Sequence, residues 1–120
     1  MSDAVTFTGA VADVPDRMMA LDALAMPSLN EGFPNVLVEA QLSGLPIMVS
    51  DRVTRDCDMT GLLRYLPLEP GVWTEALAVA APTDRVQASA RAREAVAKRG
   101  YDVNIAAAKL RQRYEALARE

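Results

Sequence analysis

Histidine is absent from this sequence of 120 residues, and Cys57 is its single cysteine. A disulfide within the chain, a zinc site of Cys and His ligands, a Ser/His/Asp triad and histidine acid–base catalysis are therefore excluded for these residues. Aromatic residues are also scarce, at 5%, and none lies among basic residues in an arrangement suited to base stacking. Nucleic acid is consequently not an expected partner.

Long apolar runs are missing as well. No stretch approaches the roughly 18 apolar residues that a membrane span requires, and the start MSDAVTFTG lacks both the basic and the apolar regions of a signal peptide. These absences predict a cytoplasmic location. Peripheral association of the full enzyme with the inner face of the membrane is compatible with this prediction. Hydrophobic residues nevertheless make up 51% of the chain, so a single packed domain is expected.

Charge is distributed unevenly along the chain. Residues 1–83 contain 4 basic and 11 acidic side chains, whereas residues 84–120 contain 9 and 5, which gives formal charges of −7 and +4. A basic segment can face anionic lipid or nucleic acid. The preferred interpretation is a solvated helix face, because its basic residues alternate with alanines. These residues are Arg85, Arg91, Arg93, Lys98 and Arg99.

Short β-type runs alternate with helical stretches through the first part of the chain, and helices follow to the end. This βαβ pattern predicts parallel strands, because parallel neighbours need crossover connections that place helices on the sheet faces. The expected fold is α/β, a three-layer Rossmann-like parallel sheet with a helical C-terminal tail. Strands are predicted over residues 5–8, 24–26, 46–49 and, more weakly, 63–66.

Capping residues delimit the expected helices. Asp13 suits the N-cap of the first and Pro15 its first turn. Pro34 stands near the start of the second, and Gly44 is placed to adopt the left-handed conformation beyond its end. The predicted helices span residues 13–21, 34–42, 73–80, 85–99 and 103–119, with Gly100 between the last two.

The final helix has an apolar side. Ile105, Leu110, Tyr114 and Leu117 fall on one face of it. A helix with such a face is expected to dock on another surface.

Residues 28–46, SLNEGFPNVLVEAQLSGLP, are the most informative segment. They follow a strand and enter a helix, the position where parallel sheets bind ligands. Gly32 permits close backbone approach, and the start of the helix favours an anion such as a diphosphate. Glu31 and Glu39 could accept hydrogen bonds from vicinal sugar hydroxyls. Taken alone, the same pattern also fits an ordinary loop and helix, because both features are common in α/β proteins.

A wider segment, FTGAVADVPDRMMALDALAMPSLNEGFPNVLVEAQLSGLPIMVSD, closely resembles the donor-binding core of the family 4 (group 1) glycosyltransferases of GT-B fold. The ordered matches include Gly9, Asp22 and the pair Pro27 and Ser28, followed by Glu31-Gly32-Phe33-Pro34, Glu39-Ala40 and Gly44-Leu45-Pro46. The end of the chain, with Trp73, Gly100-Tyr101-Asp102 and Tyr114, is also similar to the close of such domains, particularly those acting in polysaccharide assembly.

The resemblance implies that residues 1–120 are part of the C-terminal, nucleotide-sugar-binding domain of a retaining glycosyltransferase of polysaccharide or glycolipid assembly. A nucleoside diphosphate sugar would be the donor substrate, with no cofactor and no metal. Glu39 would accept the ribose hydroxyls and Glu31 a hydroxyl of the donor sugar. Gly32, Phe33, Pro34 and Asn35 would place their backbone near the sugar and the diphosphate, although Pro34 has no N–H to donate. No residue is assigned a catalytic role.

The sequence departs from the family at its start. The glycine-rich turn, the Arg and Lys phosphate ligands and the acceptor-binding half all lie upstream of the region that corresponds to Val5. We therefore expect no transfer by this chain alone, a separate acceptor-domain chain as a partner, and a homo-oligomer formed through a sheet edge at residues 5–8 or through the tail. The alternatives are a non-catalytic nucleotide-binding module and an oligomerising α/β unit.

Three residues after the third predicted strand need an interpretation of their own. Asp56 and Asp58 stand where many members of the family have a single acidic residue near the donor. We interpret both as solvated or capping carboxylates, and Cys57 as a small, buried filler.

Overall fold

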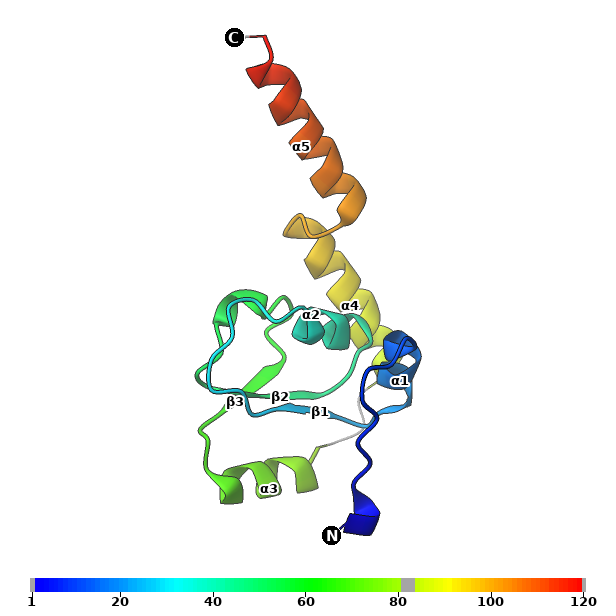
Figure 1. Cartoon of the computed structure of the whole chain (residues 1–120), viewed down its shortest axis with the longest axis vertical. Helices are drawn as coiled ribbons and strands as arrows, with labels where there is room; N and C mark the ends of the chain where they lie inside the picture. The colour runs from blue at the N-terminus through cyan, green and yellow to red at the C-terminus, as the bar shows by residue number, and fades with distance from the viewer. Residues whose placement is uncertain (1, 81–83, 120) are drawn as a thin grey trace.

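The computed structural model describes residues 2–80 and 84–119. The molecule is elongated, with extents of 62 × 28 × 28 Å, because the last helix extends away from a layered body (Figure 1). The elements in chain order are η1 (Ser2–Ala4), α1 (Val14–Ala20), β1 (Leu24–Met26), α2 (Asn35–Leu42), β2 (Ile47–Ser50), η2 (Arg55–Cys57), β3 (Leu63–Leu66), α3 (Pro70–Ala78), α4 (Arg85–Lys98) and α5 (Val103–Leu117).

The sheet has three parallel strands in the order β1-β2-β3. Leu24 pairs with Ile47, and Ile47 in turn pairs with Leu63. The strands predicted at residues 24–26 and 63–66 are confirmed with these bounds, and the one predicted at 46–49 begins one residue later. All three strands end at the same edge of the sheet, so the loops that follow β1 and β2 lie on that side.

The strand predicted at residues 5–8 is wrong. This segment is irregular and exposed, and within the described chain it pairs with no strand. Phe7 is 94% exposed. A run of β-type residues becomes a strand only where its N–H and C=O groups find a hydrogen-bonded neighbour. The free edge of the sheet on this side therefore belongs to β1.

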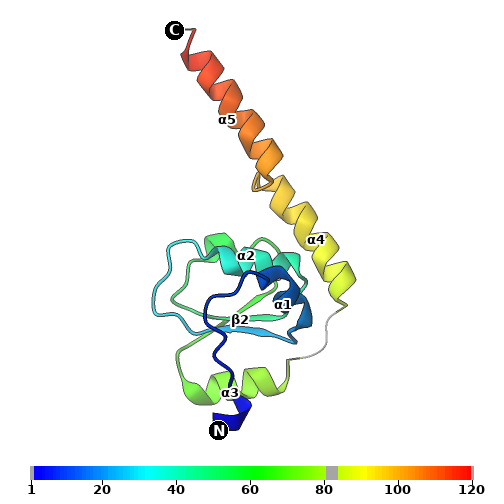
Figure 2. The ribbon, with the colours of Figure 1, turned by 45° about the vertical axis from the view of Figure 1, so that its right-hand side comes forward.

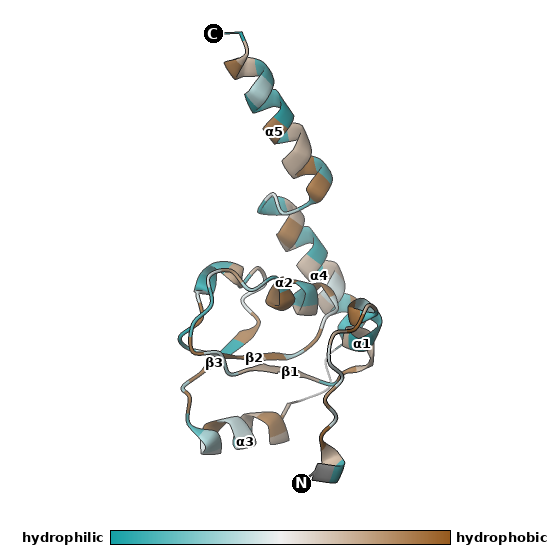
Figure 3. Ribbon diagram, in the orientation of Figure 1, coloured by the Kyte–Doolittle hydropathy of each residue, from teal (hydrophilic) through white to brown (hydrophobic). Residues whose placement is uncertain are grey.

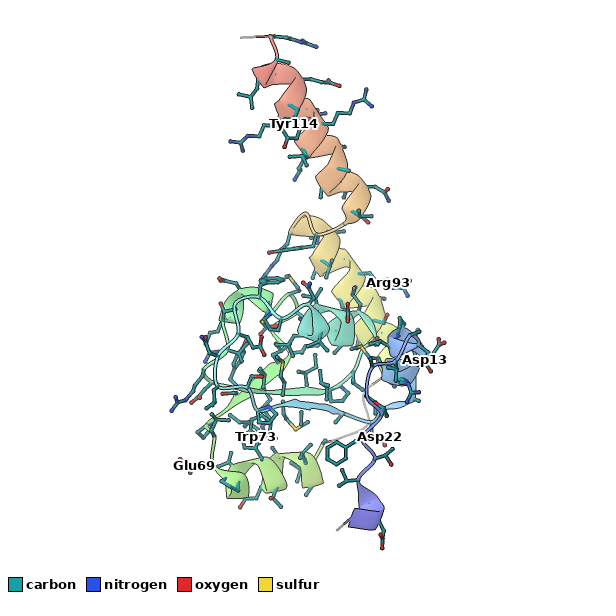
Figure 4. The ribbon with its side chains drawn as sticks, in the orientation of Figure 1. Asp13, Asp22, Glu69, Trp73, Arg93 and Tyr114 are labelled. Carbon is teal, nitrogen blue, oxygen red and sulfur yellow. The ribbon has the colours of Figure 1, made fainter. Side chains whose placement is uncertain are left out.

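Helices cover both faces of the sheet, as expected for a three-layer fold. Figures 1 and 2 show α1, α2 and α4 on one face and α3 on the other. Alternation along β2 explains this arrangement, because successive side chains point to opposite faces. Val49 packs in a cluster with Leu37 of α2, whereas Met48 packs with Trp73 of α3. In Figure 4 Trp73 lies between α3 and the sheet.

Gly44 joins α2 to β2 in the left-handed conformation that the sequence predicts, with φ of 67°. A Cβ at this position would also lie 2.4 Å from the backbone oxygen of Arg85 in α4. Both the backbone conformation and the close approach of α4 therefore require glycine here.

Arg85 contradicts the prediction of a solvated basic face. Its guanidinium donates hydrogen bonds of 2.7–3.2 Å to the carbonyl oxygens of Met18, Met19, Leu21 and Ser43. These carbonyls are at the ends of α1 and α2, where helices leave C=O groups unpaired and the dipole favours a cation. The other four basic residues of this group are exposed, as predicted.

Two helix starts differ in detail from the prediction. Asp13 is the N-cap residue of α1 but makes no side-chain cap, since its carboxylate accepts a 2.9 Å hydrogen bond from Arg17. Helix α3 begins at Pro70, three residues before the predicted start at Trp73. A proline suits the first turn because its missing N–H would have no partner there.

Helix α5 packs on none of the described residues. None of its side chains is buried, and it extends beyond α4 with hydrophobic and hydrophilic residues along its length (Figure 3). Its start is nevertheless well defined, because the Asp102 carboxylate accepts hydrogen bonds from the backbone N–H groups of Asn104 and Ile105. The surface on which the apolar face of α5 was predicted to dock is therefore not among the described residues. Across the described ranges, no helix is both long and apolar enough to span a membrane.

Candidate functional site

The loop from Pro27 to Pro34 leaves the carboxyl end of β1 and enters α2. Glu31 is half-buried in this loop, and its Oε1 atom accepts a 3.0 Å hydrogen bond from the Ser28 hydroxyl. The bond orients the carboxylate and uses one of its several acceptor positions. The remaining positions can receive hydroxyl groups from a ligand.

Gly32 follows Glu31 at the exposed surface of the same loop. A Cβ at this position would meet no atom within 4 Å, and the backbone does not adopt a positive φ. Neither packing nor conformation within the chain therefore requires glycine at this position. The missing side chain leaves space in which a ligand can approach the backbone closely.

The start of α2 lies beside this open position. Pro34 is the buried N-cap residue, and no side chain among the described residues caps the helix. The first N–H groups of a helix have no partner within the helix, and its dipole favours negative charge there. Exposed Asn35, the first residue of α2, therefore begins a turn that can bind an anion.

Glu39 lies further along α2, on the wall of a groove between α1, α2 and α4. The groove has a volume of about 560 Å³, within the usual range for ligand pockets. Figure 4 shows Arg93 on α4 and Asp13 at the start of α1, near this groove. Its lining residues are Val14, Pro15, Met18, Met19, Glu39, Leu42, Ser43, Ser89 and Arg93.

The structure places the two predicted carboxylates at separate positions near α2, one in the loop before this helix and one on its exposed side. Glu31 is in the loop, whereas Glu39 is exposed on the groove wall. In the part of the chain that the structure describes, neither forms an ion pair. Both carboxylates are therefore available as hydrogen-bond acceptors. Residues 2–80 and 84–119 hold no group of three His, Cys, Asp or Glu side chains arranged to bind a metal ion.

The loop after β2 is held by its own hydrogen bonds. Asp58 accepts a 2.7 Å bond from the N–H of Gly61, as expected for a capping carboxylate. Asp56 is exposed. Cys57 is fully buried, as predicted, and its thiol donates to the Thr54 carbonyl. Burial is the main reason that the pKa of Cys57 is raised. These contacts are structural, and none of them points to a ligand.

Tyr65 of β3 packs against the same loop. The guanidinium of Arg55 lies 4.2 Å from the centroid of its ring, a distance suited to a cation–π contact. Burial, followed by the proximity of Cys57 and Asp58, raises the pKa of Tyr65 to about 12, although Arg55 acts in the opposite direction. The loop after β2 is thus anchored to the sheet.

Two contacts to the site come from residues to which sequence reasoning gave no role. Ser28 binds Glu31, and Tyr101 stacks on Phe33 with ring centroids 5.4 Å apart and an interplanar angle of 14°. A serine three residues before a carboxylate is a weak local signal. The partner of Tyr101 is 68 residues away, so no spacing in the sequence indicates it.

The sequence of the chain matches a known family. The profile of the family described as "Glycosyl transferases group 1" matches residues 1–98. The chain belongs to this glycosyltransferase family. EpsF of Bacillus subtilis (strain 168), which is named as a glycosyltransferase, is 44% identical over 101 residues, covering 82% of this chain and 26% of EpsF.

A second relative matches a shorter segment. The UDP-Gal:alpha-D-GlcNAc-diphosphoundecaprenol alpha-1,3-galactosyltransferase of Escherichia coli is 42% identical over 45 residues, which cover 38% of this chain and 12% of that enzyme. The chain thus spans about a quarter of the length of EpsF and less of this enzyme. No solved structure matches with comparable significance.

Proposed function

We propose that this glycosyltransferase chain carries the site for a nucleoside diphosphate sugar, the donor substrate of a retaining transfer reaction. The observation that supports this proposal best is the open space over Gly32, between the Glu31 carboxylate and the uncapped start of α2. Such a surface offers a hydroxyl acceptor and an anion-binding helix start next to backbone that a ligand can approach.

In this proposal the nucleoside lies in the groove beside Glu39. Side chains such as Val14, Pro15 and Met18 give the groove apolar walls, which suit the faces of a base. Glu39 has no ion-pair partner among the described residues, and its carboxylate can accept both hydroxyls of a ribose.

The diphosphate would lie at the start of α2 and the sugar beside Glu31. In the transfer, the bond between the anomeric carbon and the diphosphate oxygen breaks, and the diphosphate leaves with the electron pair. The acceptor oxygen bonds to that carbon from the same face, and its proton passes to the diphosphate. Negative charge grows on the leaving group, so N–H groups at the start of α2, from Asn35 onward, would stabilise the transition state.

The acceptor side belongs to the proposal too. Because the chain spans about a quarter of EpsF, we propose that the acceptor-binding surface and the basic phosphate ligands come from other parts of the enzyme or from a partner chain. A lipid-linked sugar, which the name of the Escherichia coli relative indicates for that enzyme, is one class of acceptor. The present chain would then bind the donor without transferring the sugar.

Calorimetric titration with uridine and guanosine diphosphates and their sugars tests the donor site. Glu39→Gln should weaken binding roughly 10- to 150-fold, because a charge-assisted hydrogen bond contributes about 1.5–3 kcal/mol. Glu75→Gln, at an exposed position of α3, is the matched control and should bind like the wild type. Absence of binding by the wild type, or equal binding by the Glu39 variant, would contradict the proposal.

A second pair of variants tests the space over Gly32. Gly32→Ala should weaken binding of the nucleotide sugar while leaving the fold intact, since the added Cβ meets nothing within the chain. Gly71→Ala is an equivalent control, because Gly71 in α3 is also open and has no positive φ. If both variants bind the donor as the wild type does, the ligand does not lie over Gly32.

Self-association is a second candidate role, favoured by α5. Its large apolar side chains are 40–75% exposed, and the +4 charge of residues 84–120 complements the −7 charge of residues 1–83 in another copy. We propose that two copies can associate through this helix. Sedimentation should then show a dimer at micromolar concentration that Leu110→Glu converts to a monomer. A wild type that stays monomeric at high concentration would contradict this role.

A further inference from the structure

The ring of Tyr101 is the one described aromatic that stacks on the loop between β1 and α2. Its centroid lies 5.4 Å from that of Phe33, with the two planes inclined by 14°. This geometry is that of an offset stack, which contributes about 0.5–1.5 kcal/mol beyond simple burial. Phe33 also packs against the main core cluster, so its ring is held between the core and Tyr101.

Tyr101 is held in place from both sides. Gly100 before it has φ of 82°, and the N–H of Tyr101 donates to the Val96 carbonyl at 3.1 Å, which closes the end of α4. Asp102 after it caps α5. The short link between two helices therefore has little freedom to move the ring away from Phe33.

The neighbouring Arg99 strengthens this arrangement. One of its guanidinium nitrogens lies 3.5 Å from the backbone oxygen of Asp56 and 3.6 Å from the sulfur of Met59. Arg99 at the end of α4 thus contacts the loop that follows β2, and Tyr101 two residues later contacts the loop that follows β1. The two loops leave the same edge of the sheet, and this segment supports both.

The loop that carries Glu31 has few other restraints. Between Ser28 and Phe33 the described hydrogen bonds are limited to the one from the Ser28 hydroxyl to Glu31. A loop without backbone hydrogen bonds keeps its shape through packing. Phe33, two residues from Glu31, is the side chain through which that packing acts.

We propose that Tyr101 is a positioning residue of the donor site: by stacking on Phe33 it holds the loop that presents Glu31 and Gly32 to the nucleotide sugar. The inference rests on the donor-binding function proposed above. Tyr101 need not touch the ligand, and its hydroxyl accepts and donates no hydrogen bond among the described residues. The aromatic ring alone therefore carries the role.

Backbone NMR relaxation on the whole chain, together with titration of uridine diphosphate sugars, tests this role. Tyr101→Ala should lower the order parameters of the amides of residues 30–33 from the rigid range, about 0.85, toward 0.6 or less. It should also weaken donor binding roughly 2- to 12-fold, the factor that corresponds to one aromatic stack. Tyr101→Phe keeps the ring and should restore both values.

Tyr114→Ala is the control in the tail, because Tyr114 is 65% exposed on α5 and should affect neither measurement. The amides of β2 should remain rigid in every variant, which separates a local effect from unfolding. A loop that stays rigid in Tyr101→Ala, or Tyr101→Phe as impaired as Tyr101→Ala, would overturn the inference. Absence of donor binding by the wild type would overturn the function on which it rests.

Discussion

Helices α2 and α5 both have apolar residues at helical spacing in the sequence, but the structure buries those of α2 and leaves those of α5 exposed. Helix α2 buries Leu37 and Ala40 completely against the sheet. Helix α5 has a regular apolar side formed by Ile105, Leu110 and Tyr114, and each of these side chains is at least 40% exposed. Figure 1 shows α2 within the layered body and α5 outside it.

The difference shows what an apolar helix face predicts. It indicates that the face gains free energy when covered, but not that the covering surface belongs to the same chain. Helix α2 is followed after a tight turn by β2, so its partner is local. Helix α5 follows a short link and continues the direction in which α4 leaves the sheet (Figure 2), and its cap at Asp102 stabilises the helix without any packing.

The comparison is tested most directly by removing equal side chains from the two helices. Leu37→Ala should lower the free energy of unfolding by about 2–5 kcal/mol, since it leaves a cavity beneath a fully buried position. Leu110→Ala, at a position 54% exposed, should change it by less than about 0.5 kcal/mol in the monomer. Urea unfolding followed by circular dichroism, at a concentration where the chain is monomeric, measures both. Similar losses would mean that α5 packs against its own chain in solution.

Glutamine offers a second matched pair. The buried amide of Gln41 donates to the carbonyls of Leu37 and Cys57 and accepts from the N–H groups of Met59 and Thr60. Gln41→Ala should cost about 1–3 kcal/mol, because buried polar groups lose their partners.

Gln112→Ala, on exposed α5, is the control for Gln41→Ala and should leave the unfolding midpoint almost unchanged. The same urea titration applies to both. An equal shift of the two midpoints would show that the Gln41 contacts contribute nothing to stability.

A pair of arginines, one with described partners and one without, extends the comparison to a smaller expected loss of stability. Arg85→Lys keeps the charge but loses the planar group that reaches the ends of α1 and α2, so a loss of about 0.5–1.5 kcal/mol is expected. Arg113→Lys in α5, which has no described partner, should have no measurable effect. If lysine at position 85 is as stable as arginine, the network of carbonyl contacts is not the reason for its presence.

The last expected effect is confined to alkaline pH. In the folded state the pKa of Tyr65 is about 12, above the ordinary value of 10.0. Folding therefore favours the neutral phenol, and its contribution to stability is complete below pH 10 and is lost as the pH rises toward 12. The urea midpoint of Tyr65→Phe should depend less on pH across this window than that of the wild type. If the midpoints of both proteins changed equally with pH, the prediction would be contradicted.

The elements with strong local signals could be predicted from sequence. Leu24–Met26 and Leu63–Leu66 are strands with the expected bounds, and Gly44 and Gly100 have the positive φ that their places after helices require. The failures have a common cause. The run at residues 5–8 has strand-forming residues but no pairing neighbour, and Arg85 looks like any solvated arginine until α1 and α2 meet it.

For the candidate site, the sequence indicated the types and the order of the residues, but it did not indicate how they are arranged in space. The spacing of Glu31 and Glu39 predicted two acceptors near a helix start, and their roles toward a donor remain a proposal. That Glu39 faces a groove formed with α1 and α4, and that Phe33 is covered by Tyr101, depends on helices far away in the chain.

By itself the sequence determined the family, the alternation of strands and helices and the turns, because these depend on residue type and on neighbours within a few positions. Only the tertiary structure decided which runs find partners. It left residues 5–8 unpaired, placed Arg85 at two helix ends and left α5 exposed. Hydrogen bonds and packing between distant segments are set by the three-dimensional path of the chain, and no local pattern contains that path.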